Sequence, residues 1–281
     1  RADNLEDAMV IQNDSDFGLT GGIHTLDDRE IRVWREQVEV GNAYINRPIT
    51  GAIVKRQPFG GWKKSCFGPG AKAGGPNYVS IFATWEQAEM PMLVADLSQN
   101  VGVLVNELKS VLDETRLLES AAGSFAHWYE KEFSIEHDPS NLHGETNHFR
   151  YVPLRRLLVR AEGLDDTELA VILLAAATAG VIVDVSVSSE RRISGASCVI
   201  ESDSAFVDRL PKIAEKYASL RAPVTNDSMR RAANDAGLQL VDWKVLLNGR
   251  IELMHYFREQ SISECVHRYG NIIPKPGTLG E

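Results

Sequence analysis

The chain of 281 residues has little cysteine. Its three cysteines, Cys66, Cys198 and Cys265, lie far apart and none belongs to a C-x-x-C pair. The odd number fits no complete disulfide framework. This pattern is typical of reduced thiols in a cytoplasmic protein, and we expect a cytoplasmic location.

Other absences exclude further classes of protein. No apolar run approaches the ~20 residues that cross a bilayer, so we expect no transmembrane segment. The net charge of −9 argues against nucleic acid as a partner, because a nucleic-acid binder usually has a basic face. No G-x-G-x-x-G follows a predicted strand, so nothing here holds a dinucleotide pyrophosphate by itself. The G-x-S-x-G nucleophile elbow of α/β-hydrolases is absent too.

The titratable residues form no evident catalytic or metal set. His143, Glu145 and His148 lie close in sequence, but their spacing is not that of H-E-x-x-H, and we predict a solvated loop with no metal. Cys66 follows Lys64 and Ser65, and a nearby cation can lower a thiol pKa. It has no histidine or acid beside it in sequence, so we predict a plain thiol and not a catalytic nucleophile.

Helices and strands alternate along the chain and predict an α/β fold with a parallel sheet. Predicted helices cover residues 4–13, 101–112, 203–217 and 226–236, with others starting at Asp27 and Asp165; predicted strands cover 19–25, 40–46, 152–160, 181–188 and 238–245. Residues 127–145 are polar and predict an irregular connection. The chain opens on a helix with no leader or initiator Met, and we expect it to be cut from something longer.

The most informative segment is a long glycine-rich loop over residues 46–78. Its glycine pairs, Gly60-Gly61 and Gly74-Gly75, lie near Gly68 and Gly70. Glycines permit positive φ and leave backbone N–H groups open to an anion. A plain turn is the alternative for either pair. Loops of this length within compact domains are usually functional or disordered, and the apolar residues here favour an ordered, functional loop.

Residues 41–65, which end in R-Q-P-F-G-G-W-K-K-S, resemble the C-terminal part of aldehyde dehydrogenases. Together with A-K-A-G-G-P-N-Y at residues 71–78, they point to the branch that oxidises L-glutamate γ-semialdehyde, the hydrolysed form of Δ1-pyrroline-5-carboxylate. Residues 250–271 resemble the end of bacterial bifunctional proline utilization A proteins, in which a proline dehydrogenase half precedes the aldehyde dehydrogenase half. The match is strong over residues 4–85 and looser beyond.

The resemblance implies the following site residues. Asn46 and Phe59 resemble the wall near the nicotinamide end of NAD. Gly74 and Gly75 resemble the loop whose amides bind the substrate carboxylate, which Ser65 helps to shape, and Phe82 is a weaker candidate for the substrate wall. An ordinary core position is the alternative for both phenylalanines. A semialdehyde that carries an α-carboxylate needs such preorganised N–H groups.

The same resemblance implies what this chain lacks. In the family a cysteine attacks the aldehyde, hydride passes to NAD, and a glutamate assists hydrolysis of the thioester. None of the three cysteines matches that nucleophile, so we expect no catalytic residue here and no activity of the chain alone. FAD belongs to the upstream proline dehydrogenase half.

The resemblance also implies a domain organisation. We expect the end of an aldehyde dehydrogenase module at residues 1–92, a connecting region at 93–148, and a Rossmann-like, noncatalytic domain at 149–281. This domain ends in a strand-like motif, 258–271, of which Ser261–Asn271 is predicted to pair as an edge strand with the first module. Expected partners are L-glutamate γ-semialdehyde, the remainder of the polypeptide and further copies in a homo-oligomer. A noncatalytic structural or oligomerisation module, and a piece of a monofunctional aldehyde dehydrogenase, are the alternatives.

Overall fold

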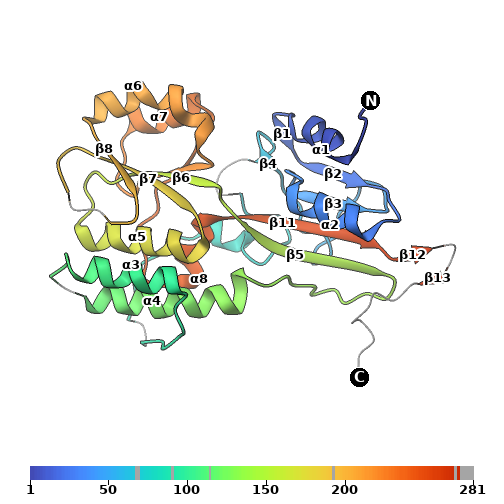
Figure 1. Ribbon diagram of the computed structural model, residues 1–281, viewed down its shortest axis with the longest axis horizontal. Coiled ribbons are helices and arrows are strands. Elements are labelled where there is room, and N and C mark those ends of the chain that lie inside the picture. The colour runs from blue at the N-terminus through green and yellow to red at the C-terminus, as the bar shows by residue number, and fades with distance from the viewer. Residues whose placement is uncertain (67–69, 90–91, 114, 192–193, 269–270, 273–281) are drawn as a thin grey trace. The chain divides into compact units, whose positions relative to one another are not determined.

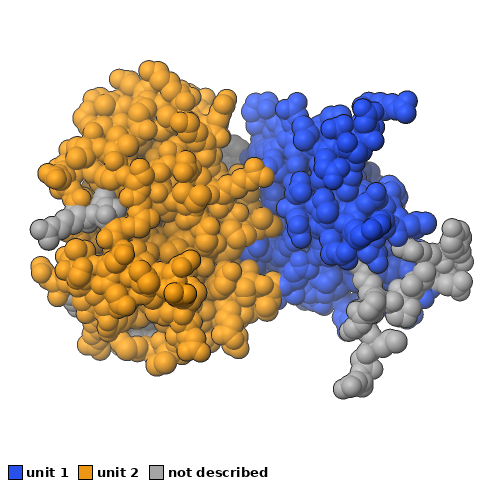
Figure 2. Space-filling view, viewed as in Figure 1, with its two compact units in different colours: residues 1–83, 136–151, 259–281 blue, residues 84–135, 152–258 orange. Residues whose placement is uncertain are grey.

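The computed structural model describes the whole chain except residues 67–69, 90–91, 114, 192–193, 269–270 and 273–281 (Figure 1). Gly68 and the end of the predicted terminal motif therefore lie outside the described residues. The chain divides into two compact units (Figure 2). Unit 1 comprises residues 1–83, 136–151 and 259–281, and unit 2 comprises residues 84–135 and 152–258. These contact units do not test the module bounds at residues 92 and 148, which stay predictions.

Unit 1 is built on a four-stranded sheet of order β2-β3-β11-β5. Its strands are β2 (Thr20–Ile23), β3 (Asn42–Ile45), β11 (Phe257–Cys265) and β5 (Glu145–Pro153). A small second ladder pairs β1 (Phe17–Gly18) antiparallel with β4 (Trp62–Lys63). Helices α1 (Leu5–Asn13) and α2 (Asp28–Gln37) and the 3₁₀ turn η1 (Tyr78–Phe82) complete the unit, with a short hairpin of β12 (His267–Arg268) and β13 (Asn271–Ile272).

The local sequence explains why α1 and α2 form. Asn4 and Asp27 cap their N-termini by accepting hydrogen bonds from the N–H groups of Asp7 and Arg29, both at 2.8 Å. The two helices then bury one apolar cluster with β3 and β11, which comprises Met9, Ile31, Trp34, Val38, Val40, Ala43, Ile45 and Ile262. This cluster fixes β3 beneath the glycine-rich loop that follows it.

The end of the chain supplies an internal strand of this sheet. Ser261–Glu264 of β11 pairs in parallel with Asn42–Ile45 of β3, which confirms the predicted pairing with the first module. The predicted edge position is wrong, because β5 flanks β11 on its other side. The hydrophobic cluster explains the difference, since Ile262 is 1% exposed and only an interior strand is covered so completely.

Unit 2 contains a five-stranded, wholly parallel sheet of order β10-β9-β6-β7-β8. Its strands are β6 (Arg156–Arg160), β7 (Ile182–Val187), β8 (Ser197–Ile200), β9 (Ser219–Arg221) and β10 (Gln239–Val241). The chain turns back at β6, as in doubly wound nucleotide-binding folds. The predicted α/β class with a Rossmann-like sheet is confirmed.

Helices cover both faces of this sheet. Figure 1 shows α6 and α7 on one side and α3, α4 and α5 on the other. The helices are α3 (Gln99–Lys109), α4 (Arg116–Trp128), α5 (Asp166–Ala179), α6 (Asp203–Ile213), α7 (Asp227–Asp235) and α8 (Gly249–Glu252), with 3₁₀ turns η3 (Ala214–Lys216) and η4 (Leu253–Tyr256). No helix among the described residues is long and apolar enough to cross a membrane.

The expectation of an irregular connection over residues 127–145 is wrong in its first part. Helix α4 runs to Trp128 and continues as a π-helical turn, η2 (Tyr129–Phe133). The reason is that aromatic side chains in and beside this segment are buried, although most of its residues are polar. Phe125 and Phe133 are 0% and 2% exposed, and the Phe133 ring stacks on Phe257 with centroids 5.0 Å apart. Tertiary packing therefore extends the helix through a segment of polar sequence.

Candidate functional site

The two glycine turns of the loop are joined by backbone hydrogen bonds. Phe59 and Ala73 each donate an N–H to the other's carbonyl oxygen, both at 2.9 Å. Gly60 directly follows Phe59 in the chain, and Gly74 directly follows Ala73. The structure thus brings together the two segments that the sequence predicts to face the cofactor and the substrate carboxylate.

The Gly74-Gly75 turn has a conformation that requires glycine. Gly74 has φ +75°, a region that L side chains rarely adopt, and an added Cβ would lie 3.2 Å from the Val54 side chain. The Gly75 N–H donates to the Lys72 carbonyl oxygen at 2.9 Å. Among the described residues, the Gly74 N–H has no such partner. The Gly74 N–H is therefore available to donate to a carboxylate. The Gly75 N–H could donate to one only as a bifurcated hydrogen bond shared with the Lys72 carbonyl oxygen.

A buried lysine supports the underside of these turns. The Lys72 side chain is 1% exposed. Its Nζ donates to the Gly41 carbonyl oxygen and the Asn42 Oδ1, both at 2.9 Å, and to the Gly60 carbonyl oxygen. Three acceptors match the three N–H bonds of an ammonium group. Burial lowers the pKa of Lys72 to about 7, against the opposing charge of Glu259.

Asn42 connects the start of β3 to the Pro-Phe-Gly-Gly turn. Its Nδ2 donates to the Pro58 carbonyl oxygen and its Oδ1 accepts the Gly60 N–H, both at 3.1 Å. Ser261 of β11 donates a second hydrogen bond to the Pro58 carbonyl oxygen at 2.6 Å. The backbone at Gly41 packs directly against the backbone at Gly60. A Cβ added to Gly41 would lie 1.9 Å from the Gly60 carbonyl oxygen. The turn is thus fixed by polar contacts with two adjacent strands.

Glu259 of β11 holds the other side of the frame. Its carboxylate accepts the Lys72 N–H at 2.8 Å and the Asn77 side-chain amide at 2.7 Å. Its carbonyl oxygen accepts the Trp62 indole N–H at 2.8 Å, and Asn77 also donates to the Tyr151 hydroxyl at 3.0 Å. Lys72 and Asn77 bracket the Gly74-Gly75 turn, so one carboxylate contacts both of its ends.

The remaining predicted site residues lie in several places. Phe59 and Phe82 are 38% and 74% exposed, so neither is an ordinary core aromatic. Phe82 ends η1, where its ring packs edge-on against Tyr78 with centroids 5.6 Å apart. Asn46 has φ 55°, and its Oδ1 accepts the Thr25 N–H at 3.0 Å. Ser65 lies at the β1–β4 ladder, where its Oγ accepts the Gly18 N–H at 3.2 Å.

These positions bear on how NAD fits. The partly exposed Phe59 ring offers an apolar face, and in the described part of the chain the side-chain N–H groups of Asn46 donate to no other residue, which suits a nicotinamide ring and its carboxamide. Ser65 accepts the Gly18 N–H at the base of the loop. The residues therefore fit one end of the cofactor, and their roles stay predictions.

The basic run beside the turn is engaged within unit 1. Lys63 pairs with Glu39 at 2.8 Å, and Lys64 pairs with Asp16. Glu145 pairs with Arg47 at 3.3 Å and with Arg56. In the described part of the chain no three histidine, cysteine or carboxylate side chains gather where a metal ion could bind. The ionic groups near the loop thus stabilise its conformation.

The sequence analysis missed Lys72, Asn77 and Glu259. Lys72 gives a weak signal, because a lysine between small residues and a Gly-Gly pair has no solvated helix face to occupy. Glu259 gives none, because it lies 187 residues from the N–H that it accepts.

At the carboxyl edge of the unit 2 sheet, buried arginines pair with carboxylates of the same unit, and a hollow of about 230 Å³ lies beside the ends of β6 and β7. Doubly wound sheets bind ligands where the strand order reverses, at the carboxyl ends of the strands. Here β6 and β9 end in Arg160 and Arg221, both 0% exposed. Arg160 pairs with Asp203 at 2.7 Å, and Arg221 pairs with the equally buried Glu252 at 3.1 Å.

The helix that would meet a pyrophosphate is also acidic. Asp165 and Glu168 form a capping box at the start of α5, and Asp166 lies in the same turn. These carboxylates occupy the N–H groups and repel an anion. The start of α5 is therefore unfavourable for a pyrophosphate.

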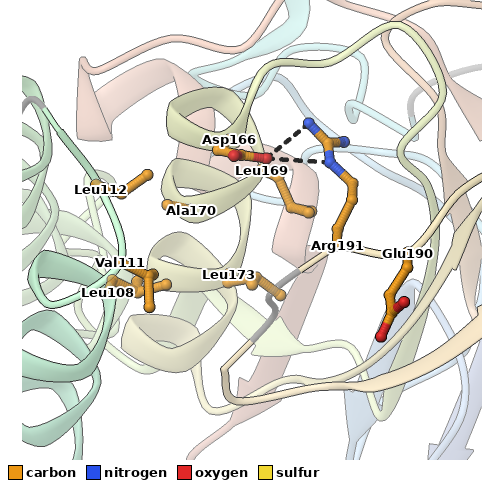
Figure 3. Close-up of a pocket in the computed structure, with 9 residues that line it drawn as sticks. All are labelled: Leu108, Val111, Leu112, Asp166, Leu169, Ala170, Leu173, Glu190 and Arg191. Carbon is orange, nitrogen blue, oxygen red and sulfur yellow. Dashed lines mark hydrogen bonds and ion pairs between the residues drawn. The ribbon is translucent and has the colours of Figure 1, made fainter.

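A hollow of about 410 Å³ lies beside α5 in unit 2 (Figure 3). Leucine and alanine side chains of α5, including Leu169 and Leu173, line it together with Leu108 of α3. At its rim Asp166 pairs with Arg191 at 2.9 Å. Arg191 also donates to two backbone carbonyls, at 3.2 and 2.6 Å, so its charge is engaged within the unit, and the exposed Glu190 lines the same hollow.

Comparison with known proteins relates the two parts of the chain to one parent architecture. The aldehyde dehydrogenase family matches residues 1–87. Enzymes named 1-pyrroline-5-carboxylate dehydrogenase from Bacillus cereus (strain B4264) and Bacillus cytotoxicus are 44% and 43% identical over 81 residues, which is 29% of this chain and 15% of each relative. A solved structure of Proline Utilization A (PutA) from Corynebacterium freiburgense is 38% identical with a TM-score of 0.77 and covers 96% of this chain.

The chain spans only 15% of those Bacillus proteins and 25% of the PutA chain. Residues 1–87 match the aldehyde dehydrogenase family, and 96% of the chain is similar in structure to one part of a proline utilization A protein.

Proposed function

We propose that this chain is part of an NAD-dependent L-glutamate γ-semialdehyde dehydrogenase that acts in the breakdown of proline to glutamate. Residues 46–78 supply the anchor for the substrate carboxylate, with the Gly74 N–H as first donor and the Gly75 N–H as second. The name of the Bacillus relatives and the PutA match support the substrate class. Proline dehydrogenase activity with FAD, a cytoplasmic location and a homo-oligomer belong to the same proposal for the complete protein.

One observation carries the proposal. The two turns that would face cofactor and carboxylate are bonded to each other through Phe59 and Ala73 and rest on the buried Lys72. A rigid pair of turns holds the two ends of a semialdehyde at a fixed separation, which favours one orientation of the aldehyde carbon. The exposed Phe59 ring excludes water from that region when a ligand covers it.

NAD, when bound, supplies the hydride acceptor. This chain contributes binding and orientation, because none of Cys66, Cys198 and Cys265 matches the family's nucleophile. We therefore propose that the chain alone is inactive. A purified sample of the chain, incubated with NAD and L-glutamate γ-semialdehyde, should form no NADH above the blank; turnover near the rate of the complete enzyme would contradict this assignment.

The substrate class has a separate test in the complete polypeptide. kcat/KM is measured for L-glutamate γ-semialdehyde and for butanal, which lacks the α-carboxylate. A carboxylate held by backbone N–H groups contributes about 1.5–3 kcal/mol, so we expect a preference of at least tenfold for the semialdehyde. Equal values of kcat/KM would refute the anchor.

For unit 2 we propose a noncatalytic, structural role. The observation that favours this role lies at the carboxyl edge of the sheet. There Arg160 and Arg221 form ion pairs with carboxylates of the same unit. Isolated unit 2 residues are expected to bind no NAD in calorimetric titration. A second measurement uses the Arg221→Met variant of the complete protein with the family's own cofactor site blocked. If this variant still binds NAD saturably, the noncatalytic role of unit 2 is contradicted.

A further inference from the structure

Glu259 lies far from the glycine loop in sequence, yet its carboxylate is the contact shared by both ends of the Gly74-Gly75 turn. One oxygen accepts the Lys72 N–H at 2.8 Å, and the other accepts the Asn77 amide at 2.7 Å. Four residues, 73–76, lie between these two donors. The turn is thus closed by a bridge that the loop itself does not contain.

We propose that Glu259 is a positioning residue for the substrate carboxylate, which acts through Lys72 and Asn77 and never touches the substrate. This inference rests on the proposed function and adds the residue that sets the direction of the Gly74 N–H. The C-terminal strand β11 thereby determines how tightly the anchor binds.

The geometry explains why another residue type would serve poorly. A carboxylate has only acceptor sites, and here each oxygen faces a donor. One of them is a backbone N–H, which cannot rotate away without moving the turn. If both contacts were lost, the Lys72 N–H and the Asn77 amide would need new partners, and the backbone between them would relax.

The rest of the frame would stay in place without Glu259. Lys72 Nζ keeps its three acceptors, and the Phe59–Ala73 pair keeps both backbone bonds. The Glu259 backbone also keeps its bond from the Trp62 indole, which no side-chain change removes. A change at Glu259 should therefore alter the turn and leave the unit folded.

The test uses the complete polypeptide and three variants. Glu259→Leu removes both acceptors at similar volume. Glu259→Gln keeps one acceptor for the Lys72 N–H, and its amide can donate to Asn77 if that side chain flips. Glu6→Gln, an exposed carboxylate in the first turn of α1, is the matched control. KM and kcat are measured for L-glutamate γ-semialdehyde and for butanal.

A positioning role predicts a split between the two substrates. Glu259→Leu should raise KM for the semialdehyde about tenfold and change KM and kcat for butanal less than twofold. Glu259→Gln should fall between this variant and the wild type, and Glu6→Gln should match the wild type. Equal losses with both substrates, or no change with either, would overturn the inference.

Two further outcomes are distinguishable. If the wild-type protein shows no preference for the semialdehyde, the proposed function fails; a preference that persists in Glu259→Leu overturns only the role of Glu259. If Glu259→Leu does not fold, Asn77→Ala and Glu259→Gln decide: a raised semialdehyde KM with unchanged butanal kinetics supports the inference, and unchanged kinetics with both substrates overturns it.

Discussion

The buried ion pair of unit 2 gives the sharpest stability prediction. Arg221 and Glu252 are both 0% exposed, and their closest N–O distance is 3.1 Å. The Glu252 carboxylate also accepts the Leu246 N–H at 3.0 Å and the Tyr256 hydroxyl at 3.1 Å. Burial and the Glu252 charge raise the pKa of Tyr256 well above its usual value, so this hydroxyl stays a donor.

Glu252→Gln keeps the shape and one acceptor but removes the only carboxylate that pairs with Arg221 among the described residues. Leaving a buried charge without its partner costs about 3–5 kcal/mol. In a domain of this size that loss lowers Tm by roughly 6–20 °C. Calorimetry of the wild type and the variant at pH 7 measures the shift.

Two comparisons make this prediction falsifiable. Glu86→Gln removes an ion pair with Lys244 in which the Glu86 side chain is 76% exposed. This change should shift Tm by less than 2 °C. The double variant Arg221→Met with Glu252→Gln should be more stable than Glu252→Gln, since no unpaired charge remains. Equal shifts for Glu86→Gln and Glu252→Gln would refute the reasoning.

Three smaller predictions follow from the same structure. Gly41→Ala should lower Tm strongly, because the new Cβ would lie 1.9 Å from the Gly60 carbonyl oxygen. Gly180→Ala, at φ +73° but in open space, should cost only about 1 kcal/mol in urea unfolding, and a loss as large as that of Gly41→Ala would contradict the difference drawn between them. Burial disfavours the charged form of Glu136. The nearby positive charges of Arg35, Arg150 and His148 outweigh burial and hold the pKa of Glu136 below 4.5. Its stabilisation is therefore present above pH 4.5 and is lost as the pH falls below that value, so Glu136→Gln should flatten the acid limb of the stability curve and cost about 1 kcal/mol at pH 7 for a partly exposed pair. An unchanged acid limb in unfolding measurements from pH 3 to 7 would show that this pair contributes nothing.

The elements that the sequence predicts best are those with local signals. Asp27 and the apolar face of α2 predict that helix because capping and periodicity act within a few residues. The alternation in residues 181–188 likewise predicts β7. The π-helical turn at Tyr129–Phe133 was missed, because it depends on a ring at Phe257 that is distant in sequence.

The candidate site divides in the same way. The loop that contains Phe59 and Gly74 could be found from its glycines and from its resemblance to a family. The contacts that hold the loop could not be found, because Glu259 and Ser261 reach it through a strand pairing that no local pattern encodes. The local sequence thus predicts the loop as the ligand-binding surface, and it gives little sign of the groups that hold the loop in place.

The interior position of β11 has a consequence for how the protein is made. β3 leaves the ribosome well before Ser261–Glu264, with which it pairs in parallel. Until that segment arrives, β3 has one open edge, with unpaired N–H and C=O groups that can recruit strands of other chains. The many intervening residues also make this pairing a slow, high-contact-order step. Newly made chains therefore pass through a period of aggregation risk that lasts until β11 inserts beside β3.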